Sequence, residues 1–211
     1  MFGISIYYLD LFGVAVFATT GALVASRKQL DIISFALLAT LTGVGGGTVR
    51  DLILDRPVFW TVDQTYLVTC LAIAVIAFFT SHLIQRRYLT LIWLDAVGLA
   101  AYGVLGAHIA HQHGMGFFVA TALGMMTATF GGMIRDVVSD ENTLILQAEI
   151  YATAALVAAG GYLTLVYLGL TPSIAALIGT CVGFAIRACA IQFGWQLPRY
   201  KPREGRDIDA L

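Results

Sequence analysis

The sequence predicts an all-α integral membrane protein with seven transmembrane helices, built as an inverted repeat of three plus three helices followed by a seventh. Composition, the spacing of the apolar segments and an internal repeat support this prediction. Of 211 residues, 59% are hydrophobic and 12% are charged, with a mean hydropathy of +0.83. Soluble domains carry about 25% charged residues. The net charge of −1 offers no basic field for a nucleic acid, so we expect a lipid bilayer as the surroundings and no nucleic-acid partner.

Seven apolar segments are long enough to cross a bilayer, which takes about 20 residues. They are roughly Ile4–Ala25, Ile32–Val49, Tyr66–Ile84, Tyr88–Ala107, Met115–Ile134, Ile150–Leu170 and Ser173–Phe193. The first lacks a preceding basic region and is expected to be retained as a span. We therefore predict one transmembrane domain over residues 1–197. It comprises repeat one (about 4–84), repeat two (about 88–170) and the seventh helix (about 173–193), and a cytoplasmic polar tail follows at 198–211.

Basic residues in the short loops indicate how the spans are oriented, because such residues favour the cytoplasmic side. They follow the first, third and seventh spans, at Arg27, Lys28, Arg86, Arg87, Arg199, Lys201, Arg203 and Arg206. All three groups fall on one side of the membrane if the N-terminus is outside and the C-terminus is cytoplasmic.

An internal repeat appears when the chain is shifted by 85 positions, which aligns residues 9–55 with 94–140 without a gap. Identical charges then coincide, namely Asp10 with Asp95, Arg50 with Arg135, Asp51 with Asp136 and Asp55 with Asp140. The second copy begins after three spans, so it enters the membrane from the opposite side. Inverted repeats of this kind place permeation sites near the midplane, between broken helices.

Glycine runs occupy equivalent places in the two copies: Gly45, Gly46 and Gly47 in the first, Gly131 and Gly132 in the second. Each glycine costs a helix about 1 kcal/mol, and a weakened helix in lipid frees backbone groups that need a partner or water. We therefore predict a kink or break in each helix, facing a wet path, and expect alanine at Gly46 and Gly47 together to straighten the helix while stability holds or rises. Close packing of helices through small residues is the alternative.

The charges inside the apolar segments are candidates for pore lining or for structural charge pairs. They are Asp10, Arg50, Asp51, Asp95, Arg135 and Asp136. Neighbours in sequence do not face each other on a helix, so Arg50 is not expected to pair with Asp51. Equal depths in the membrane instead predict an Asp10–Arg50 pair near the outer mouth and an Asp95–Arg135 pair near the inner one.

Neither a metal site nor an enzyme is indicated by the remaining polar residues. His108, His111 and His113 cluster near one loop, but no carboxylate or thiol stands beside them in sequence. We expect solvated loop histidines rather than metal ligands. No nucleophilic triad, catalytic carboxylate pair or cofactor motif is present, so we expect neither an enzyme nor a cofactor.

The doubled motif resembles the bacterial branch of the trimeric intracellular cation (TRIC) channel family. Its two copies are Gly45-Gly46-Gly47 followed by Arg50-Asp51, and Gly131-Gly132 followed by Arg135-Asp136. The resemblance implies a homotrimer in the bacterial cytoplasmic (inner) membrane. Each subunit would hold its own pore, lined by the kinked second and fifth helices and conducting monovalent cations, chiefly potassium. Phe130 replaces the first glycine of the second copy, which predicts a milder kink there.

The same family is associated with uptake of small solutes, glycine in particular, so a secondary carrier for a small zwitterion is the alternative function. A zwitterion site presents one charge of each sign close together, and the Arg-Asp motifs fit that requirement. A cation pore needs oxygen acceptors along a continuous wet path. The Arg-Asp motifs fit a cation pore if each arginine is neutralised by a carboxylate.

Overall fold

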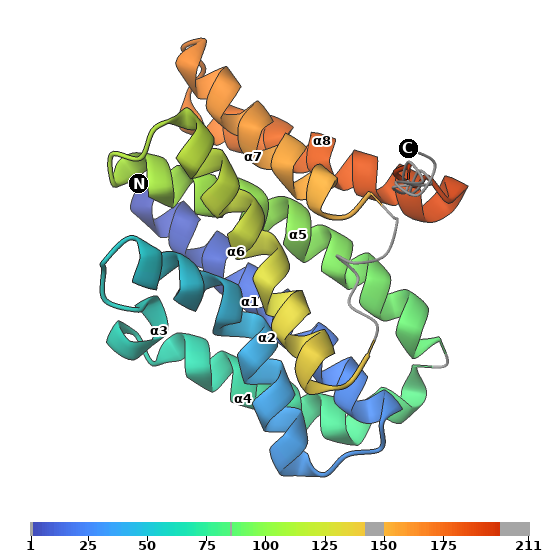
Figure 1. Cartoon of the computed structure of the whole chain (residues 1–211). Helices are drawn as coiled ribbons and strands as arrows, with labels where there is room; N and C mark the ends of the chain where they lie inside the picture. The colour runs from blue at the N-terminus through green and yellow to red at the C-terminus, as the bar shows by residue number, and fades with distance from the viewer. Residues whose placement is uncertain (1, 85, 142–149, 199–211) are drawn as a thin grey trace, which may run out of the picture.

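The computed structural model describes residues 2–84, 86–141 and 150–198, and the elements formed by these residues are helical (Figure 1). In chain order they are α1 (Phe2–Arg27), α2 (Ile32–Ile53), α3 (Phe59–Val62), α4 (Thr65–Thr80), the 3₁₀ helix η1 (Ser81–Leu83), α5 (Arg87–Gln112), α6 (Phe117–Val138), α7 (Ala152–Tyr167) and α8 (Pro172–Phe193). Residues 199–211 of the predicted polar tail lie outside the described residues.

Six helical segments in this part of the chain are long and apolar enough to cross a membrane, namely those of α1, α2, α4 with η1, α5, α6 and α8. Each corresponds to a predicted span. The sixth predicted span, Ile150–Leu170, contains the shorter helix α7 of 16 residues. At 1.5 Å per residue α7 is about 24 Å long, somewhat less than the hydrocarbon thickness of about 30 Å.

The two copies of the inverted repeat have first and second helices of equal length that begin at equivalent residues. Helices α1 and α5 each have 26 residues, α2 and α6 each have 22, and both pairs begin 85 positions apart. Figure 1 shows α2 and α6 running in opposite directions beside each other. Both helices are followed by an aspartate in the left-handed region, Asp55 and Asp140, each with φ of 50°. Aspartate is one of the few residues that tolerate this conformation.

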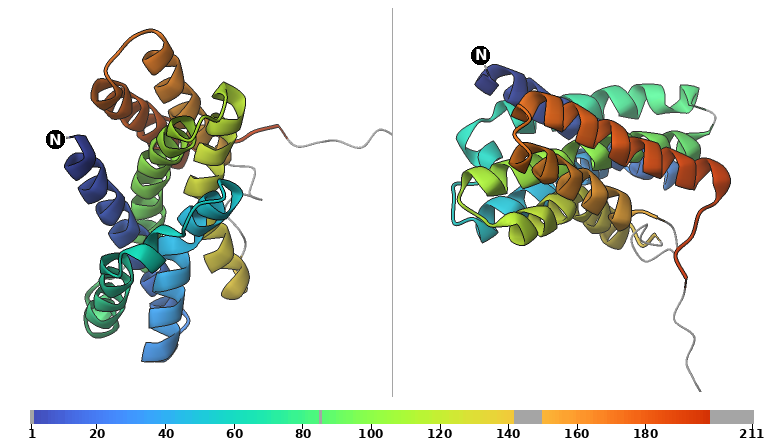
Figure 2. Two further views of the ribbon diagram at one scale, coloured as in Figure 1. Left: turned by 90° about the vertical axis from the view of Figure 1, so that its left-hand side faces the viewer. Right: turned by 90° about the horizontal axis from the view of Figure 1, so that it is seen from above.

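The two copies interlock through their first two helices. Helices α1, α2, α5 and α6 contact one another at the centre, α4 packs on α1 and α2, and α7 packs equivalently on α5 and α6. Helix α8 covers α5 and α7 and lies at the outside of the bundle (Figure 2). The predicted arrangement of three plus three helices with one appended is therefore correct.

The glycines let α2 and α6 touch at their crossing. A Cβ atom on Gly46 would overlap the carbonyl oxygen of Thr127, and a Cβ atom on Gly131 would overlap the carbonyl oxygen of Thr42. Thr42 and Thr127 are themselves equivalent in the repeat, so the two contacts are reciprocal. Such close approach favours helix association in lipid, where no hydrophobic effect drives it.

A break at the glycines is ruled out, because α2 and α6 each continue as a single helix through them, whereas a kink there stays a prediction. The expectation that alanine at Gly46 and Gly47 together leaves stability unchanged or raised is also wrong, since a methyl group at Gly46 has no space. The neighbouring glycines are crowded by side chains. A Cβ atom on Gly47 would lie 2.6 Å from the ring of Phe59, and one on Gly45 would lie 3.0 Å from the end of a flexible isoleucine side chain.

Candidate functional site

All six charges singled out in the sequence are buried, with exposed fractions of 8% or less. They gather in two clusters at the C-terminal ends of α2 and α6. The α2 cluster consists of Asp10, Arg50, Asp51, Tyr66 and Tyr102. The α6 cluster consists of Thr20, Asp95, Arg135, Asp136 and Tyr151.

In both clusters the arginine pairs with the aspartate that follows it in sequence. Nη2 of Arg50 lies 2.8 Å from Oδ1 of Asp51, and Nε of Arg135 lies 2.8 Å from Oδ1 of Asp136. The expectation that such neighbours stay apart is wrong here. That rule describes the directions in which side chains leave a helix, whereas the long arginine stem lets the guanidinium turn back towards the adjacent carboxylate.

The α6 cluster contains the second charge pair that the sequence predicts. Nη1 of Arg135 lies 3.1 Å from Oδ1 of Asp95 and donates a hydrogen bond of 2.9 Å to Oγ1 of Thr20. Arg135 therefore bridges two carboxylates, and both Arg135 and Asp95 are at most 1% exposed. A buried guanidinium with two such partners is well compensated for the loss of water.

The α2 cluster does not contain the predicted pair of Asp10 with Arg50. Among the described residues, no arginine nitrogen lies within 4.0 Å of the Asp10 carboxylate. Its oxygens instead accept hydrogen bonds from two phenols, Tyr102 to Oδ1 at 2.7 Å and Tyr66 to Oδ2 at 3.2 Å. The ring of Phe59 packs on Tyr66, with ring centres 4.7 Å apart, and its centre lies 5.7 Å from the Arg50 guanidinium.

Two differences between the repeats explain why the clusters differ. Tyr102 corresponds to Phe17, so only the α2 cluster has this second phenol. Thr20 corresponds to Leu105, so Arg50 lacks the hydroxyl that Arg135 uses. In both clusters one guanidinium nitrogen, Nη1 of Arg50 or Nη2 of Arg135, is buried without a hydrogen-bond partner among the residues that the structure describes.

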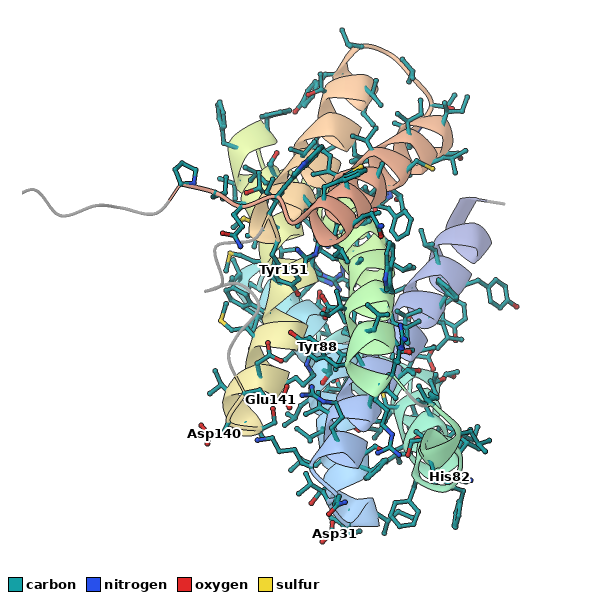
Figure 3. The ribbon with its side chains drawn as sticks, turned by 90° about the vertical axis from the view of Figure 1, so that its right-hand side faces the viewer. Asp31, His82, Tyr88, Asp140, Glu141 and Tyr151 are labelled. Carbon is teal, nitrogen blue, oxygen red and sulfur yellow. The ribbon has the colours of Figure 1, made fainter. Side chains whose placement is uncertain are left out.

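Sequence reasoning missed the four hydroxyl-bearing members of the clusters. For two of them a signal was available, because Tyr66 and Tyr151 are 85 positions apart and are therefore equivalent in the repeat. Figure 3 shows Tyr151 beside α5 and α6. The guanidinium of Arg187, from α8, lies 5.2 Å from the centre of the Tyr151 ring. The predicted seventh span, which is α8, therefore also contacts the α6 cluster.

The three histidines take no part in these clusters. His108 is only 9% exposed, and its Nδ1 forms a hydrogen bond with the hydroxyl of Tyr162. The expected solvated position is therefore wrong for His108, because α5 continues to Gln112 and holds this residue against α7. Nδ1 of His113 bonds to the carbonyl of Ile109 at 2.8 Å. The described residues form no group of three or more side chains suited to a metal ion.

The fold and the clusters define a multi-pass helical membrane protein made of two inverted copies, with buried charge at equivalent ends of α2 and α6. A family model described as glycine transporter matches residues 7–82 and 92–167, two segments that again lie 85 positions apart. The chain belongs to the UPF0126 family, the bacterial branch of the trimeric intracellular cation (TRIC) channel family.

Relatives of nearly the same length support this assignment. The UPF0126 inner membrane protein YadS of Escherichia coli is 37% identical over 201 residues, covering 92% of this chain and 96% of YadS. YvgT of Bacillus subtilis is 32% identical over 193 residues, covering 90% and 94%.

Solved structures agree with the fold. The TRIC orthologue of Rhodobacter sphaeroides is 47% identical, with a TM-score of 0.88 over 90% of this chain and 99% of that one. A second TRIC cation channel is 28% identical, with a TM-score of 0.84 over 94% of this chain and 98% of that one. The family model is described as a transporter, whereas these solved structures are described as channels.

Proposed function

We propose that this protein is a potassium-permeable channel for monovalent cations, assembled as a homotrimer with one pore in each subunit between α1, α2, α5 and α6. Solved relatives described as trimeric cation channels support the class and the assembly. The observation that carries the proposal for this chain is Asp10, a buried carboxylate whose partners are phenols rather than an arginine.

The charges of the two clusters favour cations. Each cluster holds two carboxylates and one guanidinium, and a further arginine borders each: Nε of Arg56 lies 3.6 Å from Oδ1 of Asp51, and Arg187 faces the ring of Tyr151. Among these carboxylates Asp10 has phenols rather than an arginine as partners. Its negative charge attracts cations, because the surrounding low dielectric screens it poorly. Carboxylate and phenol oxygens can also replace part of a cation's hydration shell.

A series of oxygen atoms leads from the surface towards Asp10. The hydroxyl of Tyr7 donates a hydrogen bond of 2.9 Å to Asp63, which lies in the loop before α4. The ring of Tyr7 packs edge-on against Tyr66 at 5.8 Å, and Tyr66 donates to Asp10. These groups suit the mouth of a cation path at the end of the bundle that holds the α2 cluster.

The crossing of α2 and α6 would close a path that followed the glycines. The backbones leave no room for a methyl group at Gly46 or Gly131, and therefore none for a cation. We propose that α2 and α6 line the pore and that conduction requires them to separate or bend at this crossing. Their glycines would then supply the flexibility that the sequence predicts for these positions.

A carrier for a small zwitterion such as glycine is the second candidate. It is favoured by the description of the family model and by the buried Nη1 of Arg50, which lacks a partner among the described residues. A zwitterion could place its carboxylate against Arg50 and its ammonium group against Asp10.

Currents recorded from the purified protein in a planar bilayer separate the two functions. A channel should give unitary current steps in symmetrical potassium chloride, and Asp10→Asn should lower their size, whereas His113→Gln, at an exposed position, should leave it unchanged. A carrier turns over too slowly for unitary steps and should instead accumulate labelled glycine in proteoliposomes. Glycine uptake without unitary currents would refute the channel and establish the carrier.

We also propose that the N-terminus is outside and the C-terminus cytoplasmic, in the inner membrane of a bacterium. Asp31, His82, Asp140 and Glu141 lie at one end of the bundle (Figure 3). Arg27 forms an ion pair of 3.0 Å with Glu141 at the same end. This end therefore carries the basic loops after α1 and η1, and basic loops favour the cytoplasm.

A further inference from the structure

A hollow of about 630 Å³ opens at the end of the bundle that bears His82 and Glu141 in Figure 3. It lies where the end of α1, η1 and the start of α5 come together, and we call it the basic hollow. Arg27, Arg86 and Arg87 line it together with His82 and Tyr88. Three guanidiniums around one hollow form a positive surface, which attracts anions.

Contacts with the protein hold two of these arginines in place. Nε of Arg87 donates a hydrogen bond of 2.9 Å to the carbonyl of Ser81, and its Nη1 donates to the carbonyl of Ser26 at 3.3 Å. The guanidinium of Arg27 lies 4.8 Å from the centre of the Tyr88 ring. A guanidinium that is already fixed loses less side-chain freedom when it binds a ligand. The two arginines are therefore prepared to bind an anion.

The carboxylates that the structure describes neutralise only part of this positive charge. Arg27 forms an ion pair of 3.0 Å with Glu141, whereas the hydrogen-bond partners of Arg87 are neutral carbonyls. The side chain of Arg86 is exposed and has neither an ion pair nor a hydrogen bond among the described residues. Two of the three guanidiniums therefore have N–H groups left to donate. The planar guanidinium fork matches the oxygens of a phosphate group.

The inverted repeat provides an internal comparison for the basic hollow. Helix α8 begins 85 positions after α5, just as α5 ends 85 positions after α1. The residues equivalent to the three arginines are Gln112, Thr171 and Pro172. Because these helix ends recur without positive charge, their packing does not itself require guanidiniums. Basic loops also orient the spans, but that role needs only charge near the membrane and not side chains that share one hollow.

We propose that the basic hollow binds a phosphate group, carried by the headgroup of an anionic glycerolipid or free in solution. Arg86 and Arg87 donate to its oxygens. Tyr88 and Leu89, which follow them into the span, line the same hollow and are 45% and 42% exposed. A lipid whose phosphate lay against the arginines would place its chains along these apolar side chains, and basic residues at a bilayer surface attract anionic headgroups. This site is separate from the charge clusters and does not depend on the proposed channel.

Isothermal titration of the purified protein in one uncharged detergent tests the proposal. One arm adds phosphatidylglycerol with two short acyl chains, and the other adds inorganic phosphate at constant ionic strength. Saturable binding of the lipid alone would identify a headgroup as the source of the phosphate group, and saturable binding of inorganic phosphate would identify free phosphate. Arg86→Gln should weaken the binding about tenfold or more, the ratio expected from one hydrogen bond to a charged group. Because Arg86 has no such contact among the described residues, this variant should keep the native melting temperature.

Matched variants separate the basic hollow from general attraction to positive charge. Lys28→Gln removes an exposed charge from the same end of the bundle but outside the hollow, and it should leave the affinity within about twofold of native because exposed charges are screened by salt. Arg86→Lys keeps the charge without the planar fork and should bind between native protein and Arg86→Gln. Absence of saturable binding in both arms would overturn the proposal. Equal effects of Arg86→Gln and Lys28→Gln would also overturn it, because diffuse charge would then account for the binding.

Discussion

The unequal clusters predict unequal coupling between their acidic and basic members. Arg135→Gln would leave Asp95 and Asp136 buried without their shared cation. Removing one member of a buried pair typically costs about 3–5 kcal/mol. Asp95→Asn is milder, at about 1.5–3 kcal/mol, because Asp136 still pairs with Arg135 at 2.8 Å. In the double variant the two losses overlap, so we expect a coupling energy of at least about 1.5 kcal/mol.

The equivalent cycle at the α2 cluster should show weaker coupling. Among the described residues, Asp10 and Arg50 share neither a salt bridge nor a hydrogen bond, so only their longer-range attraction couples them. Asp10→Asn should cost about 1–3 kcal/mol, mainly through its phenol partners.

Thermal melting of the purified protein in one detergent provides the assay. For a chain of this size, 1 kcal/mol corresponds to about 2–4 °C, so Arg135→Gln should lower the melting temperature by about 6–20 °C. The combination of Asp10→Asn with Arg135→Gln joins residues of different clusters and serves as the additive control. Coupling between Asp10 and Arg50 as large as that between Asp95 and Arg135 would refute the assignment of their partners.

Two further predictions concern single contacts, and a third concerns the orientation of the spans. Gly46→Ala should lower the melting temperature because its methyl group would overlap the backbone of α6. Gly161→Ala has open space around the new methyl group and should raise the stability by up to about 1 kcal/mol. Equal shifts in melting temperature would contradict the packing role of Gly46. Tyr102→Phe removes the shorter bond to Asp10 and should cost about 1–3 kcal/mol and alter the unitary current. An unchanged current would argue against a cation path past Asp10. Cysteines introduced at positions 63 and 86 should react with an impermeant thiol reagent from opposite sides of the membrane, the one replacing Asp63 from outside and the one replacing Arg86 from inside. Reaction of both cysteines from one side would exclude the proposed orientation.

The helices and their repeat could be predicted because both depend on patterns that one sequence displays. Apolar length locates a span, and identical charges at a constant offset locate its copy. That offset is preserved from Asp10 and Asp95 to the residues that follow α2 and α6, Asp55 and Asp140. The shortness of α7 relative to its apolar segment was not predictable, since hydropathy does not show where a helix begins within an apolar run.

The role of the glycines could not be read from propensity. Glycine weakens an isolated helix, but at Gly46 and Gly131 it permits contact with the opposite backbone, which only tertiary structure reveals. The partners of Asp10 were missed for a related reason. Charge matching considers arginines, whereas a buried carboxylate is equally satisfied by the phenols of Tyr66 and Tyr102.

The reciprocal crossing of α2 and α6 has a consequence for how the protein is made. Gly46 is synthesised 85 residues before Gly131. At about 5–20 residues per second, ribosomes take roughly 4–17 s to cover that distance. During this interval the glycine face of α2 has only lipid or the insertion machinery to contact, because its partner surface does not yet exist. The first three spans therefore form an unfinished half that reaches its native packing only after the second half has entered the membrane in the opposite sense.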